Sequence, residues 1–228
     1  PEVLARRSVA YFDVLVKKEL KMSNLVLQCL PKVMKENFIN NVQGFTKLRE
    51  QEIKIQKDFT DKKLKFVTKM EQLKTKQNNE FFNTLYSVFL ELPGPLRFNE
   101  NKFRESLNNS ETILTTLRLG NTNGQIVGFA KGGPLENYNL RIEINDENYG
   151  KNNTIFLEPI ALKMGYWGLG AGHKLRQMFI MQAHTLNYKH LTSFAFRNVI
   201  ESRINGMEKA EFVVKFDPEH WDYYRIPL

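Results

Sequence analysis

The glycine-rich stretch 168–172 is the part of this sequence best suited to bind a charged ligand. It follows an apolar run over 154–162 and precedes a segment with helical periodicity that begins near residue 173. A strand, a glycine-rich turn and a helix in this order present main-chain N–H groups to an anion. Glycine lets the main chain approach a phosphate closely, and a helix N-terminus adds about half a positive charge. The sequence therefore predicts a phosphate-bearing ligand near residues 168–173.

Pro159 and Glu158 lie inside the apolar run and give it a second chemical feature. Proline has no N–H and cannot complete a central ladder, so Pro159 predicts a bulge or a splayed edge. Glu158 is a candidate base, which could take a proton from an amine directly or through water. The alternative interpretation is a surface carboxylate that faces outward.

The histidines and the single cysteine limit which other chemistry is expected. The spacing of His184, His190 and His220 fits no metal site, so no zinc chemistry is expected. His173, at the start of the predicted helix, is interpreted as a capping or phosphate-side residue rather than as a base. Cys29 stands alone, which excludes an internal disulfide and, with no secretory segment visible, favours a cytoplasmic protein.

The chain carries a formal net charge of +8 over 228 residues. Its lysines concentrate in residues 47–76, where they alternate with acids. This pattern is typical of a solvated helix rather than of a basic face that binds nucleic acid, so nucleic acid is not expected as a partner. No apolar run reaches the roughly 20 residues that a membrane span needs.

Residues 1–92 have apolar residues at helical spacing and are predicted to form a helical region. Within it, residues 44–77 predict an amphipathic, mostly exposed helix. Such a region could dock a partner protein or form a homodimer. The sequence Leu92-Pro93-Gly94-Pro95 cannot continue a helix, so a second domain is predicted over 93–228.

After this boundary the apolar period changes from helical to alternating. Strands are predicted at 112–119 and 125–131, with a turn at 121–124 where Asn and Gly tolerate positive φ. The other predicted elements are a short helix near 102–107, a short strand or loop at 141–144, strands at 154–162, 190–196, 211–216 and 221–226, and helices at 175–186 and 198–207. No strand is predicted before residue 111. The fold class is α+β, with a helical region followed by a mixed, mostly antiparallel sheet flanked by helices.

Several segments between residues 112 and 216 together resemble one family. They are Gln125-Ile126-Val127-Gly128-Phe129-Ala130, Ile160-Ala161-Leu162, the glycine-rich stretch with the following His173-Lys174-Leu175, Leu191–Phe196, Asn198, and Met207-Glu208-Lys209-Ala210-Glu211-Phe212. In this order they resemble the third strand, the inner fourth strand, the pyrophosphate loop, the fifth strand, the asparagine that opens the next helix, and the "Tyr-x-Lys-x-Gly-Phe" signature of the GNAT acyltransferases.

The resemblance implies an acyl-CoA-dependent N-acyltransferase, with acetyl-CoA or another acyl-CoA as co-substrate and no metal. The amine would attack the thioester in a ternary complex, and the acceptor would be a small amine, an amino acid or a peptide. A bulge in the fourth strand would open a gap for the pantetheine arm, and the amides after it would face the diphosphate. The residues implied to bind the cofactor are Ile160, Ala161, Leu162, Trp167, Gly168, Leu169, Gly170, Ala171, Gly172, His173, Lys174 and Asn198. Tyr223 and Tyr224 lie on the last predicted strand, near the implied acceptor site, and join Glu158 as candidate catalytic residues, with simple packing as the alternative for each.

Three positions depart from the family pattern. Trp167 stands where Arg or Gln is usual, although its indole could wall the pocket. Met207 replaces the tyrosine acid and cannot protonate a leaving thiolate, and Glu211 replaces a glycine. A non-catalytic acyl-CoA-binding regulatory or interaction protein is therefore the alternative function. A dinucleotide-binding fold fits less well, because the glycine motif comes late and follows a hairpin.

Overall fold

The computed structural model describes residues 65–73, 78–92, 96–140, 144–167, 169–205, 211–215 and 221–228, with the single positions Lys54 and Asp58. Residues Leu64–Leu228 form one compact unit, which contains every strand and helix named below. Within the predicted helical region 1–92, residues 1–64 lie outside the described residues except for Lys54 and Asp58, which are helical, and the proline-glycine boundary at 93–95 lies outside them too.

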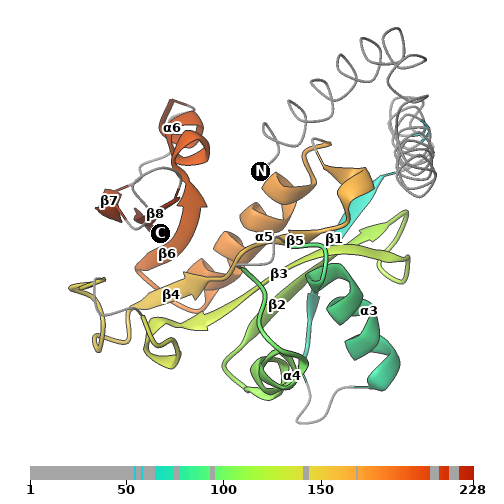
Figure 1. Cartoon of the computed structure of the whole chain (residues 1–228), viewed down its shortest axis with the longest axis horizontal. Coiled ribbons are helices and arrows are strands. Elements are labelled where there is room, and N and C mark those ends of the chain that lie inside the picture. Colours follow the sequence, from blue (N-terminus) through green and yellow to red (C-terminus); the bar gives the residue numbers. More distant parts are fainter. Residues whose placement is uncertain are drawn as a thin grey trace, which may run out of the picture. The chain divides into compact units, whose positions relative to one another are not determined.

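A mixed sheet of eight strands organises this unit (Figure 1). The strand order is β1-β2-β3-β4-β6-β8-β7, and β5 pairs with β3 beside β4. All neighbours are antiparallel except β4 and β6, which run parallel. The strands are β1 Phe66–Glu71, β2 Ile113–Leu119, β3 Ile126–Pro134, β4 Thr154–Leu157, β5 Ala161–Leu162, β6 His190–Phe196, β7 Glu211–Lys215 and β8 Trp221–Pro227.

Helices cover the two faces of the sheet, with α5 on one side and α3 and α4 on the other (Figure 1). The helices are α3 Asn79–Phe89, α4 Glu100–Asn108, α5 Ala171–Thr185 and α6 Arg197–Asn205, and the short 3-10 turns are η2 Leu135–Asn137 and η3 Met164–Tyr166. An α+β fold with a mixed, mostly antiparallel sheet is therefore confirmed. The hairpin of β2 and β3, the helix after 170 and the strand at 190–196 lie where the sequence predicts them.

Strand β1 corrects the prediction that residues 44–77 are helical. Residues 66–71 pair antiparallel with β2 along their whole length, from Phe66–Leu119 to Glu71–Leu114. Phe66 and Leu73 are seven residues apart, a spacing that imitates a helix seam, but pairing with β2 overrides this local signal. β1 and α3 thus belong to the same compact unit as the rest of the sheet, whereas the sequence places a boundary at 93–95.

Asparagine caps start both helices of the α3–α4 face. The side chain of Asn78 accepts from Glu80 N at 2.9 Å, and that of Asn99 accepts from Lys102 N at 2.9 Å, which satisfies amides that a helix start leaves unpaired. The buried residues of this face form one cluster between the two helices and the sheet. They are Phe82, Leu85, Val88, Phe89, Leu92, Phe103, Leu107, Leu114, Ile126, Phe129 and Ala161.

Helix α5 packs closely on β3 because glycines leave room for it. A Cβ added to Gly128 would lie 3.2 Å from Leu175 Cδ1, and one added to Gly132 would lie 2.7 Å from Phe179 Cζ. Leu175, Phe179 and Ala183 are fully buried, as expected for one stripe of an amphipathic helix. The two glycines, four residues apart on β3, therefore set the distance between α5 and the sheet.

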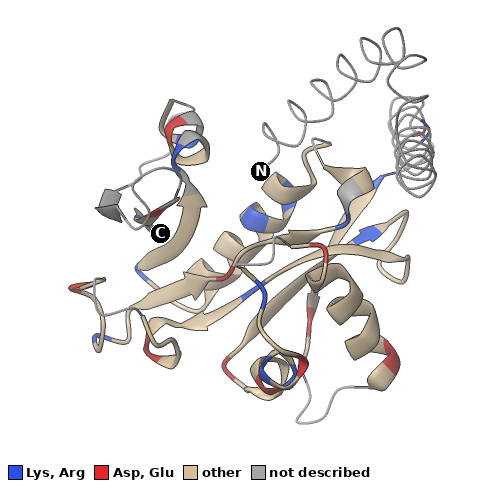
Figure 2. Ribbon diagram, in the orientation of Figure 1, with Lys and Arg blue, Asp and Glu red and all other residues tan. Residues whose placement is uncertain are grey.

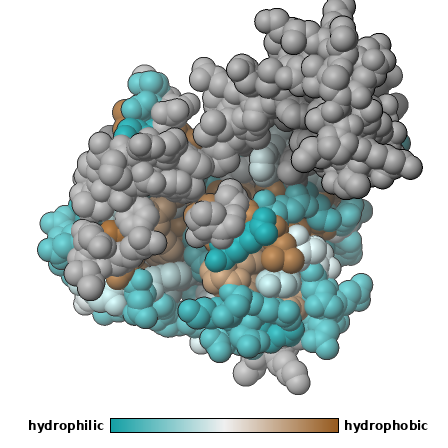
Figure 3. Space-filling view, in the orientation of Figure 1, coloured by the Kyte–Doolittle hydropathy of each residue, from teal (hydrophilic) through white to brown (hydrophobic). Residues whose placement is uncertain are grey.

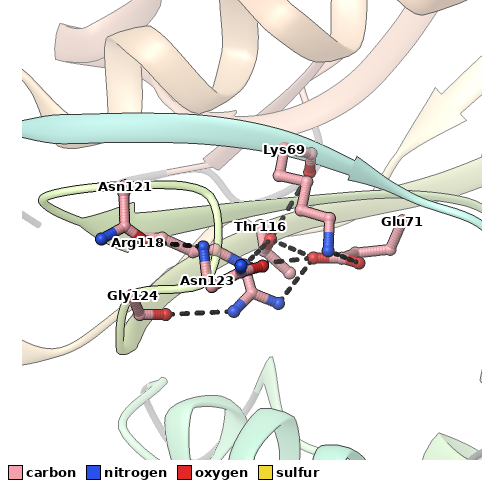
Figure 4. Close-up of polar contacts among 7 residues, drawn as sticks. All are labelled: Lys69, Glu71, Thr116, Arg118, Asn121, Asn123 and Gly124. Carbon is pink, nitrogen blue, oxygen red and sulfur yellow. Dashed lines mark hydrogen bonds and ion pairs between the residues drawn. The ribbon is translucent and has the colours of Figure 1, made fainter.

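A polar cluster ties β1 to β2 near the hairpin turn (Figure 4). Glu71 Oε1 accepts from Thr116 Oγ1 at 2.6 Å and from Arg118 Nη2 at 2.8 Å, and Lys69 Nζ lies 3.3 Å from Glu71 Oε2. Arg118 Nη1 also donates to Gly124 O at 3.0 Å. Burial raises the pKa of Glu71, but these hydrogen bonds and the Arg118 charge outweigh burial, so its pKa is lowered from 4.5.

We expect Glu71→Gln to lower the free energy of unfolding by about 1 kcal/mol at pH 7. The folded pKa lies below the unfolded one, so this stabilisation is complete above 4.5 and is lost as pH falls through the folded value. Urea denaturation at a series of pH values should show the wild-type advantage shrinking below pH 4.5. Glu105→Gln, at an exposed helical position, is the control; an advantage that does not change with pH would contradict the assignment.

Candidate active site

The predicted strand 154–162 is interrupted by a bulge. Leu157 in β4 pairs with Gly132 of β3, and Ala161 in β5 pairs with Phe129 of the same strand. The three residues 158–160 therefore stand opposite only two, 130–131, which defines a β-bulge. The bulge that Pro159 predicts is confirmed.

Strands β4 and β6 separate at this bulge. Their parallel pairing ends at Leu157–Ser193, and Ser193 Oγ donates to Leu157 O at 2.8 Å where the strands part. Beyond this point β6 continues to Phe196 with β8 as its neighbour. Among the described strands β5 pairs with β3 alone. The edge of β5 that faces β6, and the edge of β6 beyond the end of its ladder with β4, therefore have no strand partner.

Leu162 illustrates how these main-chain groups point. Lys163 N donates to Val127 O at 2.8 Å, and because directions alternate along an antiparallel strand, Leu162 turns its N–H and C=O away from β3. Its carbonyl accepts from Trp167 Nε1 at 2.8 Å. This hydrogen bond holds the segment after β5 against that strand. The sequence did not predict this role for Trp167.

The N-terminus of α5 follows this segment. Gly170 has a φ of +77°, a conformation that favours glycine, and no side chain of the described residues caps the helix. A Cβ placed on Gly170 would meet nothing within 4 Å, so there is open space beside this residue. Leu169 lies in the same turn, Gly172 in the first turn of α5, and Ala171 is buried.

The exposed residues His173 and Lys174 also lie in the first turn of α5. Figure 2 shows acids and bases spread over the unit, while α5 has basic but no acidic residues. Gly168 lies outside the described residues. Asn198 is the second residue of α6, and its side chain also lies outside them.

Glu158 lies in the bulge and is mostly buried, with 10 % of its side chain exposed. Its Oε1 accepts from Lys131 Nζ and, at 2.9 Å, from Tyr138 Oη. The alternative interpretation of Glu158 as an outward-facing surface carboxylate is therefore wrong. Glu158 and Tyr138 also line a pocket of about 260 Å³ between α4 and the end of β3. Figure 3 shows mostly hydrophilic residues over the lower part of this unit, where Figure 1 places α4.

The two tyrosines of β8 are buried and already hydrogen-bonded. Tyr223 Oη donates to Asp146 Oδ2 at 2.7 Å, and burial, together with this hydrogen bond, raises the pKa of Tyr223 far above 10. Tyr224 Oη accepts from Arg203. Tyr223 packs with Leu135, Ile144 and Phe156, so packing is a sufficient role for it, and a catalytic role for either tyrosine stays a prediction.

Sequence reasoning missed Lys131, Tyr138 and Ser193. Each acts through a contact with a residue at least 20 positions away along the chain, and no local motif announces it. No three or more His, Cys, Asp or Glu side chains within the described residues are placed to hold a metal, and no helix in that part of the chain is long and apolar enough to cross a membrane.

The mixed sheet, the bulge and the early end of the β4–β6 ladder agree with the arrangement that the sequence resemblance implies. No protein-family model matches the sequence, and no curated protein matches it. Solved structures of GNAT acetyltransferases are similar to it at low identity.

Two of these structures illustrate the likeness. The ribosomal-protein-S18-alanine N-acetyltransferase of Escherichia coli is 12 % identical, with a TM-score of 0.47 over 71 % of this chain and 94 % of that one. Arabidopsis thaliana NAA60 in complex with acetyl-CoA is 11 % identical, with a TM-score of 0.48 over 72 % of this chain and 98 % of that one.

Proposed function

We propose that this unit is an acyl-CoA-dependent N-acyltransferase that transfers an acyl group, in the simplest case acetyl, to an amine. The observation that carries the proposal is the separation of β4 and β6 at the Glu158–Ile160 bulge. After β5 and η3 the chain reaches the N-terminus of α5, which no described side chain caps. An extended ligand with amide groups could pair with the free strand edges there. Its anionic end would then reach the start of α5.

The residues present fit a coenzyme A thioester. The Leu162 N–H and the main-chain groups of Ile160 would bind the pantetheine arm, whereas by the same alternation the main-chain groups of Ala161 face β3. The amides of Leu169–His173 would bind the diphosphate, with Lys174 adding charge. The thioester supplies an activated carbonyl carbon that an amine can attack, and the sulfur leaves as a thiolate.

Glu158 is the residue best placed to handle the proton of the acceptor. It lies in the bulge itself, beside the point where the strands part, and it lines a pocket that a small amine could enter. We propose that it takes the proton that the amine loses, directly or through one water, as a general base. Positioning of the two reactants supplies most of the remaining rate enhancement.

Titration calorimetry with acetyl-CoA and longer acyl-CoA esters tests the binding step. Thiol release across a panel of primary amines then separates an enzyme from a non-catalytic acyl-CoA-binding protein, the alternative that the Met207 substitution raises. The panel consists of free amino acids, spermidine and short peptides with a free N-terminus. Absence of binding would overturn the proposal, and binding without thiol release would favour the alternative.

Helix α5 offers a charge test of the diphosphate position. We expect His173→Glu to weaken acetyl-CoA binding roughly tenfold, because the new carboxylate lies beside the bound diphosphate. Gln177→Glu, one turn further along and also exposed, adds the same charge and should change the affinity about twofold or less. An acid in the first turn favours the helix, so thermal stability should not fall; equal effects of the two variants would contradict this diphosphate site.

A further inference from the structure

Lys131 and Tyr138 both contact the same oxygen of Glu158. Lys131 Nζ and Tyr138 Oη donate to Oε1, one from β3 and the other from the connection between β3 and β4. Within the described residues Oε2 of Glu158 has no partner. The two donors therefore make the two carboxylate oxygens unequal, one held by protein and the other left for a ligand.

Lys131 is held in place by its surroundings. Its side chain is 1 % exposed, and Nζ lies 5.2 Å from the ring centroid of Phe98 and 5.7 Å from that of Phe103. Burial lowers the pKa of Lys131, and the charge of Glu158 opposes this effect. Because aromatic faces attract the ammonium but give it no anion, Glu158 is the partner that keeps this cation in the core.

Tyr138 is held equally firmly and stays a donor. Its ring centroid lies 4.5 Å from that of Phe156, so the ring cannot turn away from the bulge without losing this packing. Burial and the charge of Glu158 raise the pKa of Tyr138 well above 10. The hydroxyl therefore stays protonated near neutral pH and donates to Glu158.

The pocket beside Glu158 has few other free polar groups. Ser106 Oγ donates to Phe103 O at 2.8 Å, and Thr112 Oγ1 donates to Ser106 O at 2.7 Å. Both hydroxyls are thus engaged within the protein. The exposed side chains of Lys102 and Glu105 lie at the wall formed by α4. Oε2 is the acceptor that this arrangement leaves at the bulge.

We propose that Lys131 and Tyr138 are positioning residues, which hold Oε1 of Glu158 so that Oε2 is the oxygen presented to the acceptor amine. This inference rests on the proposed function and names residues that the sequence resemblance does not imply. A carboxylate with both oxygens free could rotate and share the amine proton between two positions. Fixing one oxygen removes that freedom before the substrate binds, which is the advantage of a preorganised site.

A double-mutant cycle tests whether Tyr138 acts through Glu158. We expect Tyr138→Phe to lower kcat about tenfold with the KM for acetyl-CoA unchanged, measured with the best amine of the panel. In a Glu158→Gln background the same change should lower kcat less than twofold, because the group that it positions is gone. Tyr149→Phe makes the same chemical change at an exposed tyrosine and should leave kcat unchanged.

The outcomes separate the two proposals. Additive losses in the cycle, or full activity of Tyr138→Phe, overturn the positioning role while the enzyme assignment stands. A wild-type protein that binds no acyl-CoA, or releases no thiol, overturns both. A ¹³C-tyrosine NMR titration adds a readout without turnover: Tyr138 should ionise at lower pH in Glu158→Gln, because the charge that raises its pKa is removed. An unchanged titration would show that the contact is absent in solution.

Discussion

Replacing Gly132 with alanine is expected to lower the free energy of unfolding by about 3 kcal/mol, the upper part of the range for overpacking. A Cβ at this position would lie 2.0 Å from Phe156 O and 2.7 Å from Phe179 Cζ. The first atom is main chain of β4, which is fixed by its ladders to β3 and β6. The second belongs to a fully buried ring on α5, so neither neighbour can move aside easily.

Gly133, the next residue, provides a matched control. A Cβ there would meet its nearest neighbour, Glu111 O, at 3.4 Å, which is ordinary contact. We expect Gly133→Ala to change stability by less than about 0.5 kcal/mol, since alanine restricts the unfolded chain slightly. Urea denaturation of the two variants measures the difference. Equal stabilities would mean that β3, β4 and α5 do not meet as closely as described.

Elements with strong local signals were predictable from the sequence. The asparagine-glycine turn between β2 and β3 needs only residues within a few positions of one another, and the α5 stripe of Leu175, Phe179 and Ala183 repeats every four. β1 was not predictable in the same way. Its apolar spacing resembles a helix seam, and it forms a strand because it pairs with residues 43 to 53 positions away in the chain.

The residues of the candidate site likewise differ in whether a local sequence signal predicts them. Pro159 predicts the bulge because proline lacks a donor, and Gly170 predicts a turn because glycine accepts the positive φ found there. Lys131 and Tyr138 carry no such signal, because Lys131 lies 27 residues and Tyr138 lies 20 residues from Glu158 in the chain. Lys131 in particular reads as an ordinary lysine at the end of a predicted strand. Only the sheet register shows that it is buried opposite the bulge.

Replacing Glu158 with alanine should lower the free energy of unfolding by about 3 kcal/mol at pH 7, because it leaves the Lys131 ammonium buried without a counter-charge. Glu105→Ala, at an exposed position on the wall of the same pocket, should cost less than about 0.5 kcal/mol. The double variant Lys131→Met/Glu158→Ala should recover most of the lost free energy of unfolding, because an uncharged methionine packs well beside the rings of Phe98 and Phe103. The cost would then belong to the unpaired charge and not to the lost carboxylate volume.

The pH dependence separates these explanations further. The pKa of Lys131 in the folded protein is already below 10.5, and Glu158 is the group that raises it. Without Glu158 the pKa of Lys131 in the folded protein falls further. At pH values between this lower pKa and 10.5 the unfolded chain binds more protons than the folded protein does. The free energy of unfolding therefore rises with pH over a wider range than in the wild type. Urea denaturation from about pH 7 to pH 10 should therefore show that the Glu158→Ala variant regains part of its lost free energy of unfolding as pH rises. The double variant, which lacks the Lys131 ammonium, should show no such gain. A deficit independent of pH would mean that Lys131 is not confined with Glu158, and the positioning of its carboxylate would need another cause.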